Sequence, residues 1–456
     1  MRLGAPAHIR ALFAAGVLFA LSLCPDSEAR DLPGLSLPVE QHALANGLHV
    51  VLAPDPAVDS ATVIVRYDVG SGDDPTGKEG LAHLVEHMMF DGSRHVPHGE
   101  YWRWIERAGG SGINGTTALD ATRYVANVPP EQLPLLLWLE SDRMGFPVLD
   151  EDGLRRAKTL IADEMRGKTG DQSMGWVMPV LFSELFPSWH PYHMDPGRSG
   201  LDGVTLADVR AFLRTWYAPR NAWLFVAGKI DAAATLALAE KYFGDLPGDA
   251  PPVRPGLPRS WRLPHARIVM GAGVLRDRVA IGWPAPPLGD PVDAALDVAA
   301  AILSDPSGRL QRALLAKGLV VSVHAGESSQ SRGSAFVISA VTADGVPAEV
   351  VEDAIERTVD DLAKTITPEE CARARSEWAT TALLRLQTPA GRASHLSSFD
   401  SALEPWGLHK YDAIGPGEIA SAVRSVLAPS NRVSVVVHHD NRYPTGGVVL
   451  SREERP

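Results

Sequence analysis

Apolar positions along this chain follow two periods, which predict strands in some segments and helices in others. Residues 41–52 and 61–69 are short runs rich in β-forming residues, and an Asn-Gly pair within the first run signals a tight turn between two strands. Residues 100–108 and 131–144 instead carry apolar side chains at helical spacing. The pattern therefore predicts a mixed chain of strands and helices.

The second half of the chain repeats the order of segments found in the first half. Residues 278–283 correspond to the strand-like residues 63–67, and residues 427–437 correspond to residues 217–227. Self-similarity of this kind indicates duplication of one structural unit. We therefore expect the same fold to occur twice in the chain.

A proline-rich stretch at residues 248–264 separates the two repeats and is predicted to be a linker. A chain of 456 residues is too long for one ordinary hydrophobic core, which also favours two domains. We predict an α+β protein in which residues 30–247 and 265–456 form repeated domains, each a mainly antiparallel sheet packed with helices. Residues 1–29 precede them as a leader.

Residues 80–92 form an apolar helical segment that carries His83, Glu86 and His87. Because positions i, i+3 and i+4 project from the same side of a helix, the two imidazoles and the carboxylate converge. Two neutral histidines can bind Zn²⁺, and a catalytic zinc takes a third protein ligand and a water. In this arrangement Glu86 is the general base that activates the zinc-bound water. The alternative is that both histidines are ordinary side chains on an amphipathic helix.

The pattern His-x-x-Glu-His is that of the inverted zincins. Residues 154–166 form a helical stretch that ends near Glu164, which we predict to be the third metal ligand, with Asp163 beside it as a solvated acid. The motif followed by a glutamate at this separation resembles the pitrilysin family of zinc peptidases, which includes insulin-degrading enzyme and the mitochondrial processing peptidase. The resemblance covers residues 40–440. It implies a zinc-dependent endopeptidase acting on peptides or unfolded segments, with one Zn²⁺ per chain and two domains that make half of a clam-shaped chamber.

In the family that this chain resembles, a strand beside the metal binds the substrate. The matching segment contains Asn114, Gly115, Thr116 and Thr117, and an extended peptide can add to such a sheet edge through main-chain hydrogen bonds. We expect these four residues to bind substrate, with Asn114 near the scissile bond. The alternative is an internal strand with Asn114 in a turn.

Three positions depart from the family pattern. Many active members carry a glutamate seven residues before the third ligand, where this chain has Ala157. Complete members also place an Arg and a Tyr in the second half, to contact the substrate and the developing oxyanion, whereas this chain has Leu314 and Val321. The resemblance therefore implies the catalytic subunit of a heterodimer, whose homologous partner lacks the zinc motif and carries the Arg/Tyr pair. The alternative is a catalytically silent scaffold or binding subunit of the same fold.

The charge and the N-terminus bear on partners and location. The formal net charge of −12 argues against nucleic acid as the partner, because phosphate binding requires basic patches. The leader has the basic-then-apolar order of a secretory signal, is too short to span a membrane, and lacks the repeated Arg and Ser of a mitochondrial transit peptide. We expect cleavage after Ala29 and export to the periplasm, while Leu23 disfavours a lipid anchor on Cys24. Cleavage would leave Cys371 as the single cysteine, so no intrachain disulfide is expected.

Overall fold

The structure is a computed structural model, and it describes residues 37–168, 177–195, 200–258, 261, 266–398, 411–443 and 447–454. The expected leader, its cleavage point and Cys24 lie outside the described residues. Within the described ranges, no helix combines the length and the apolar content that crossing a membrane would require.

The first sheet contains six strands in the order β1-β2-β6-β3-β5-β4. Strands β2 and β6 are parallel and all other neighbours are antiparallel, so the sheet is mainly antiparallel as predicted. The predicted turn joins β1 to β2, with Gly47 at a φ of +89°, a conformation that favours glycine. The strands are β1 (Glu40–Ala43), β2 (His49–Pro54), β3 (Ala61–Tyr67), β4 (Ser111–Thr117), β5 (Thr122–Val128) and β6 (Ala222–Gly228).

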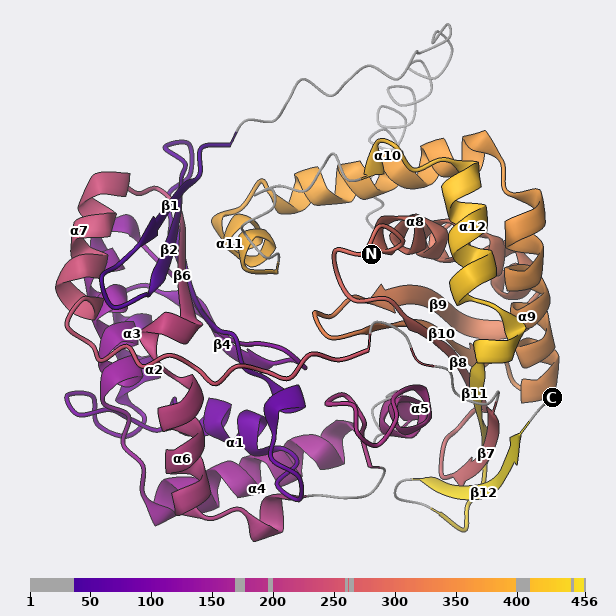
Figure 1. The fold of residues 1–456 in the computed structure, drawn as a ribbon, viewed down its shortest axis with the longest axis horizontal. Helices are drawn as coiled ribbons and strands as arrows, with labels where there is room; N and C mark the ends of the chain where they lie inside the picture. Colours follow the sequence, from indigo (N-terminus) through magenta and orange to yellow (C-terminus); the bar gives the residue numbers. More distant parts are fainter. Residues whose placement is uncertain are drawn as a thin grey trace, which may run out of the picture. The chain divides into compact units, whose positions relative to one another are not determined.

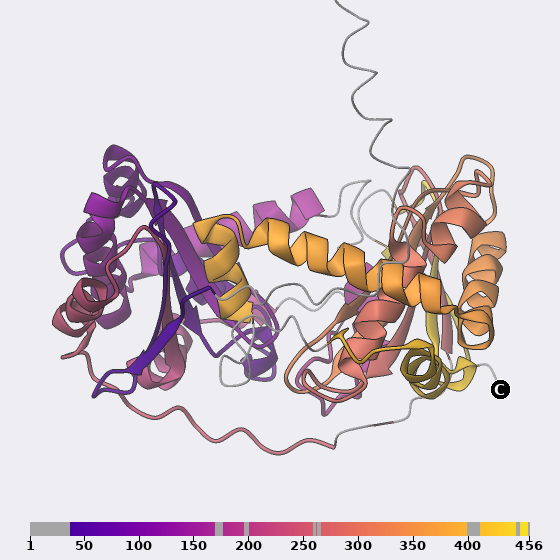
Figure 2. The same ribbon diagram turned by 90° about the horizontal axis from the view of Figure 1, so that it is seen from above.

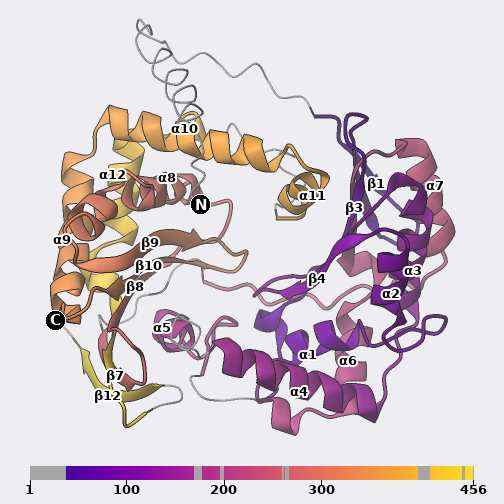
Figure 3. The same cartoon turned by 180° about the vertical axis from the view of Figure 1, so that it is seen from behind.

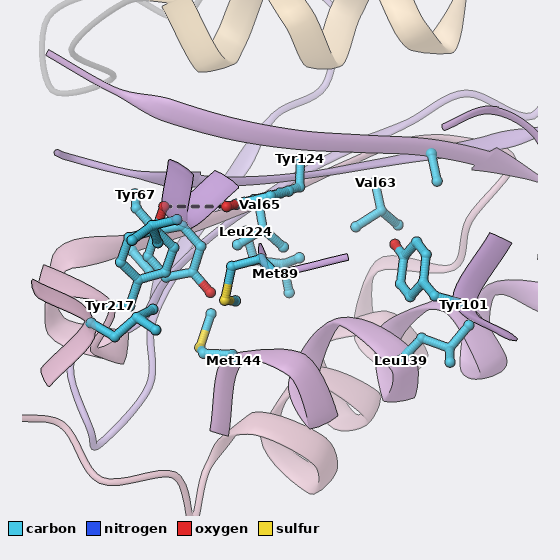
Figure 4. Close-up of a cluster of buried hydrophobic side chains, with 14 of the residues drawn as sticks. Val63, Val65, Tyr67, Met89, Tyr101, Tyr124, Leu139, Met144, Tyr217 and Leu224 are labelled. Carbon is cyan, nitrogen blue, oxygen red and sulfur yellow. Dashed lines mark hydrogen bonds between the residues drawn. The ribbon is translucent and has the colours of Figure 1, made fainter. Parts of the chain in front are cut away.

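Helices from the same half of the chain build the main core on one face of this sheet (Figure 1). Alternate strand residues point to this side, and Figure 4 shows Val63, Val65 and Tyr67 of β3 within the buried cluster. The helices that contribute core residues are α1 (Leu81–Met88), α2 (Glu100–Arg107), α3 (Leu133–Gly145), α4 (Glu151–Lys168), α6 (Leu206–Trp216) and α7 (Ala232–Phe243).

The second sheet has the order β12-β7-β11-β8-β10-β9, which repeats the first with β7 in the place of β2. Its pair β7–β11 is parallel, as β2–β6 is in the first sheet. The two sheets differ in one edge strand. In the first sheet β1 comes just before its neighbour β2 in the chain, whereas in the second sheet β12 pairs with β7 but follows all the other strands of that sheet. The strands are β7 (Ala266–Ala272), β8 (Arg278–Ala285), β9 (Val320–Ser328), β10 (Ser334–Thr342), β11 (Val433–His439) and β12 (Gly447–Glu454). The predicted duplication of the fold is confirmed.

The second core repeats the helical cover without the metal motif. Helix α8 (Asp293–Ser304) occupies the sequence position of α1 in the repeat, and after its first residue, Asp293, its buried residues are Ala, Val, Leu and Ile. The other helices on this core are α9 (Ala348–Thr365), α10 (Pro368–Arg385) and α12 (Pro416–Val426).

Each sheet is covered on its other face by a helix from the opposite half of the chain, which the sequence did not indicate. Helix α5 (Val177–Leu185) packs on β8 and β11, and α11 (Pro389–Ser398) packs on β3 and β6 (Figure 2). Gly282 of β8 permits the close approach of α5, because a Cβ there would lie 2.7 Å from Leu185 Cδ1.

This exchange joins the two halves. At the end of α11, the carbonyl oxygen of Ser397 accepts hydrogen bonds from Arg66 Nη1 at 2.9 Å and from Arg123 Nη2 at 3.0 Å. Residues Val39–Pro456 accordingly form one compact unit.

Candidate metal centre

The loop before α1 fixes where this helix begins. Gly80 adopts a φ of +95°, and both carboxylate oxygens of Asp74 accept backbone hydrogen bonds, from Gly80 N and Ala82 N, each at 2.7 Å. Burial raises the pKa of Asp74 to about 7, while the two N–H groups act in the opposite direction. By satisfying the first N–H groups, the loop also sets the direction in which each α1 side chain points.

Helix α1 separates its side chains into a core face and a polar face. Leu81, Leu84, Val85 and Met88 are buried in the core of the first half. The side chains of His83 and His87 remain 27% and 17% exposed and face α4, which lies next to α1 (Figure 3). The predicted common face of the motif is therefore present.

Candidate ligand atoms of three residues meet between α1 and α4. His83 Nε2 and His87 Nε2 are 3.2 Å apart, and Glu164 places Oε1 3.3 Å from His87 Nε2 and Oε2 3.5 Å from His83 Nε2. A tetrahedral zinc ion with bonds of about 2.0–2.1 Å separates neighbouring ligand atoms by about 3.3–3.4 Å. The donor set and its spacing therefore fit Zn²⁺.

Glu86 lies beside these atoms but makes a different contact. Glu86 is only 7% exposed, and its Oε2 accepts a hydrogen bond from Thr117 Oγ1 at 2.6 Å. Ligand atoms of His83, Glu86 and His87 all lie within 4.8 Å of one another.

The four predicted substrate-binding residues all lie on β4, at the edge of the first sheet. Strand alternation divides them, because Gly115 and Thr117 are half-buried towards α1 whereas Asn114 and Thr116 are exposed. A Cβ on Gly115 would lie 2.7 Å from Glu86 Oε1, so the β4 backbone closely approaches the carboxylate. The structure thus brings two of the four residues into contact with the motif.

The three positions that depart from the family pattern have different surroundings. Ala157 is buried against the first core, 3% exposed, one helical turn from Ile161. Leu314 is fully buried in the second core, whereas Val321 at the start of β9 is 50% exposed. Neither Leu314 nor Val321 offers a hydrogen-bond donor in its side chain.

A group of buried hydroxyls lies behind Glu86, and sequence reasoning missed it. Tyr124 and Tyr217 place their hydroxyl oxygens 3.2 Å apart, and burial raises the pKa of both phenols (Figure 4). Thr122 is fully buried and donates to the Val69 carbonyl oxygen at 2.9 Å. No signal in the sequence indicated these contacts, because Thr122 and Tyr124 lie on β5 whereas Tyr217 caps α6, far along the chain.

A cluster of ion pairs ties the second half to the loop that leads to α1. Arg332, from the turn between β9 and β10, places Nη1 2.9 Å from Asp73 Oδ1 and Nε 3.0 Å from Asp120 Oδ1. Arg254, in the proline-rich linker, binds both oxygens of the same Asp73 at 2.9 and 3.0 Å. No local signal could have found this cluster, because the partners are far apart in the sequence.

Two parts of the chain match descriptions of one peptidase family. Residues 49–172 match "Insulinase (Peptidase family M16)", and residues 203–377 match "Peptidase M16 inactive domain". The chain belongs to the pitrilysin, or M16, peptidase family. The M16 relatives include a "Zinc protease PqqE" of Helicobacter pylori, 29% identical over 71% of this chain and 74% of that protein.

Other M16 relatives are matched over a smaller share of their length. "Coenzyme PQQ synthesis protein F" of Pseudomonas aeruginosa is 31% identical over 47% of this chain and 28% of that protein. Among solved structures, a protease from Helicobacter pylori superimposes with a TM-score of 0.82 at 24% identity, covering 88% of this chain and all of that one. Pitrilysin gives a TM-score of 0.71 at 19% identity over 91% of this chain and 47% of its own. The structural likeness establishes the M16 fold.

Proposed function

We propose that this chain is the zinc-binding, catalytic subunit of a peptidase that hydrolyses peptides or unfolded segments. One observation carries the proposal: candidate ligand atoms from α1 and α4 lie 3.2–3.5 Å apart, with the buried carboxylate of Glu86 beside them. Membership of the M16 family and the name of the Helicobacter pylori relative, a zinc protease, support it.

The residues present suit zinc as the cofactor, one ion per chain. His83 and His87 would supply imidazole nitrogens and Glu164 a carboxylate oxygen, which is a three-ligand set typical of catalytic zinc. Zinc bound there would act as a Lewis acid that polarises the scissile carbonyl and acidifies water. The 41% exposure of the Glu164 side chain leaves this side of the site accessible to solvent.

Glu86 supplies the proton transfer. Its Oε2 is engaged by the Thr117 hydroxyl at 2.6 Å, whereas Glu164 contacts both imidazoles, so we assign Glu86 a place beside the ligand set rather than within it. A carboxylate in this position would take a proton from the attacking water and deliver it to the leaving amine nitrogen. The reaction then needs no nucleophilic side chain, and the peptide bond is cleaved by water directly.

The edge strand β4 would hold the substrate in an extended conformation. Because β4 has a sheet neighbour on one side only, its other side can pair with a peptide backbone. The exposed side chains of Asn114 and Thr116 are then the β4 groups available to the peptide, with Asn114 nearest the scissile bond. Binding through the main chain tolerates many sequences.

The partner we propose is a homologous chain without the zinc motif but with an Arg/Tyr pair. Leu314 is buried in this chain and Val321 is aliphatic, so neither position can donate a hydrogen bond to a developing oxyanion. A missing donor of this kind typically reduces turnover by about a hundred- to a thousandfold. We also propose that the chain is exported to the periplasm, because basic residues precede an apolar run within residues 1–29.

The competing function is a silent scaffold subunit, and one observation favours it: residues 203–377 match a domain described as inactive. That match includes none of the candidate metal ligands, since α1 and α4 both end before residue 203.

Metal analysis and peptide cleavage by the purified chain decide between the two functions. The wild type should bind about one zinc per chain and cleave members of a quenched peptide library, whereas Glu86→Gln should keep the zinc and lose turnover. Zinc-loaded wild type that cleaves no peptide, alone or with its partner, would establish the scaffold function instead.

A further inference from the structure

The hydrogen bond between Thr117 and Glu86 assigns Thr117 a role other than the substrate binding expected from the sequence. We propose that Thr117 is a positioning residue, which holds the Glu86 carboxylate in the orientation that proton transfer requires. The inference rests on the proposed function, because it concerns the residue assigned there as the general base.

The direction of the hydrogen bond follows from the chemistry of the pair. An ionised carboxylate can only accept, so the Thr117 hydroxyl must donate its proton to Glu86 Oε2, at a distance of 2.6 Å. Hydrogen bonds from neutral donors to carboxylates are shorter and stronger than those between neutral groups. This bond therefore fixes one oxygen of a side chain that otherwise has three rotatable bonds.

The Thr117 hydroxyl is itself held from behind. Thr117 pairs with Thr122 across β4 and β5, and the two hydroxyl oxygens are 3.5 Å apart. Thr122 donates its own proton to the Val69 carbonyl oxygen, and it is fully buried. With both protons directed elsewhere, this contact is one of packing, and the fully buried Thr122 limits the space beside the Thr117 hydroxyl.

The second carboxylate oxygen is confined by the β4 backbone. A Cβ at Gly115 would lie 2.7 Å from Glu86 Oε1 and 2.9 Å from Phe90 Cε2, so no side chain fits between β4 and this oxygen. Glu86 is thus placed between a hydroxyl donor and a backbone wall, both supplied by one strand. The strand that would bind the substrate also aligns the base that acts on it.

Removing the hydroxyl should impair the chemical step specifically. A general base must lie about 2.6–3.2 Å from the proton that it takes, so a carboxylate free to rotate spends part of its time out of reach. Loss of groups that orient catalytic ligands typically reduces activity by about ten- to a hundredfold. If Thr117 instead contacted substrate, its loss would raise KM and leave kcat unchanged.

The test compares Thr117→Val, Thr117→Ser and Glu86→Gln in the mature chain, with Thr62→Val as a matched control. Thr62 lies on β3 of the same sheet and donates to Asn127 Oδ1 at 2.7 Å, away from the motif. Each variant is assayed for zinc content, thermal midpoint, and kcat and KM on a quenched peptide. Crystal structures of the wild type and Thr117→Val compare the Glu86 rotamer.

We expect Thr117→Val to keep about one zinc per chain and a wild-type KM while kcat falls about ten- to a hundredfold. Thr117→Ser should restore kcat, Thr62→Val should not lower it, and the Glu86 carboxylate should move in the Thr117→Val crystal. A wild-type kcat, a rise in KM alone, or loss of zinc in Thr117→Val overturns the positioning role. If wild type and Glu86→Gln are equally inactive, the proposed function fails, and an unmoved Glu86 rotamer then rejects the positioning role separately.

Discussion

Asp73, in the loop that leads to α1, forms ion pairs with two arginines. Removing both arginines should lower the free energy of unfolding by more than the sum of the two single substitutions. The side chain of Asp73 is only 3% exposed, and it accepts hydrogen bonds from Arg254 and from Arg332. In Arg332→Ala or Arg254→Ala, the carboxylate keeps one cation. Each single change then removes charged hydrogen bonds worth about 1.5–3 kcal/mol of stability. We expect the lower end of this range, because the remaining arginine still neutralises the Asp73 charge.

The double variant leaves the Asp73 charge buried without a cation. Breaking a buried ion pair by removing the partner typically costs about 3–5 kcal/mol, because the remaining charge is uncompensated. Arg332 also binds Asp120, which keeps Tyr192 and Ser331 as donors. With each single variant at about 1.5 kcal/mol and the double variant near the middle of the ~3–5 kcal/mol range, we expect the double variant to lose about 1 kcal/mol more than the two single variants together.

Urea unfolding of the wild type, both single variants and the double variant measures this excess as the interaction free energy of a double-mutant cycle. Arg155→Ala is the matched control, because Arg155 and its partner Asp152 are both more than half exposed and should change stability by less than about 1 kcal/mol. Single and double changes that add within about 0.5 kcal/mol would refute the shared clamp on Asp73.

Four further outcomes test the site, the fold and the partnership. Glu164→Gln should lose zinc, whereas Asp163→Asn on the same helix should retain it; equal metal content in both would remove Glu164 from the ligand set. Leu396→Ala on α11 should lower the free energy of unfolding by about 2–5 kcal/mol in urea, because this 2% exposed side chain packs on the first sheet. Activity per zinc should rise at least about a hundredfold with a homologous partner that carries the Arg/Tyr pair, and full activity of the chain alone would contradict the heterodimer. Mass spectrometry of the exported protein should show a chain that begins at Arg30, and a lipid on Cys24 would contradict a soluble product.

The features that the sequence predicted well depend on local periodicity. His83, Glu86 and His87 share a helix face because the 3.6-residue period alone determines which neighbours project together. The same reasoning predicted a strand within residues 61–69, where β3 covers Ala61–Tyr67, and a helix at residues 131–144, where α3 covers Leu133–Gly145. The repeated order of segments then predicted two sheets of one design.

Glu164 shows where local reasoning ends. Its helix could be predicted from spacing, but any exposed acid on that helix was an equal candidate for the third ligand, and the family resemblance made the choice. The packing of α4 against α1 brings its carboxylate within 3.5 Å of both imidazoles while neighbouring Asp163 remains exposed. The direction in which a side chain projects from its helix follows from the local sequence. The element that this side chain then contacts depends on how the whole chain packs.

Only the tertiary structure decided which side chains meet across the chain. The apolar face of α5 would look the same in the sequence whichever sheet it covered, and folding places it on the opposite half, as it does α11. The family resemblance likewise implied that the segment of β4 lies at a sheet edge, but not that Thr117 donates to Glu86. Periodicity determines which face of a helix or strand is buried. Because hydrophobic burial is non-directional, only the packing of the whole chain determines which element covers that face.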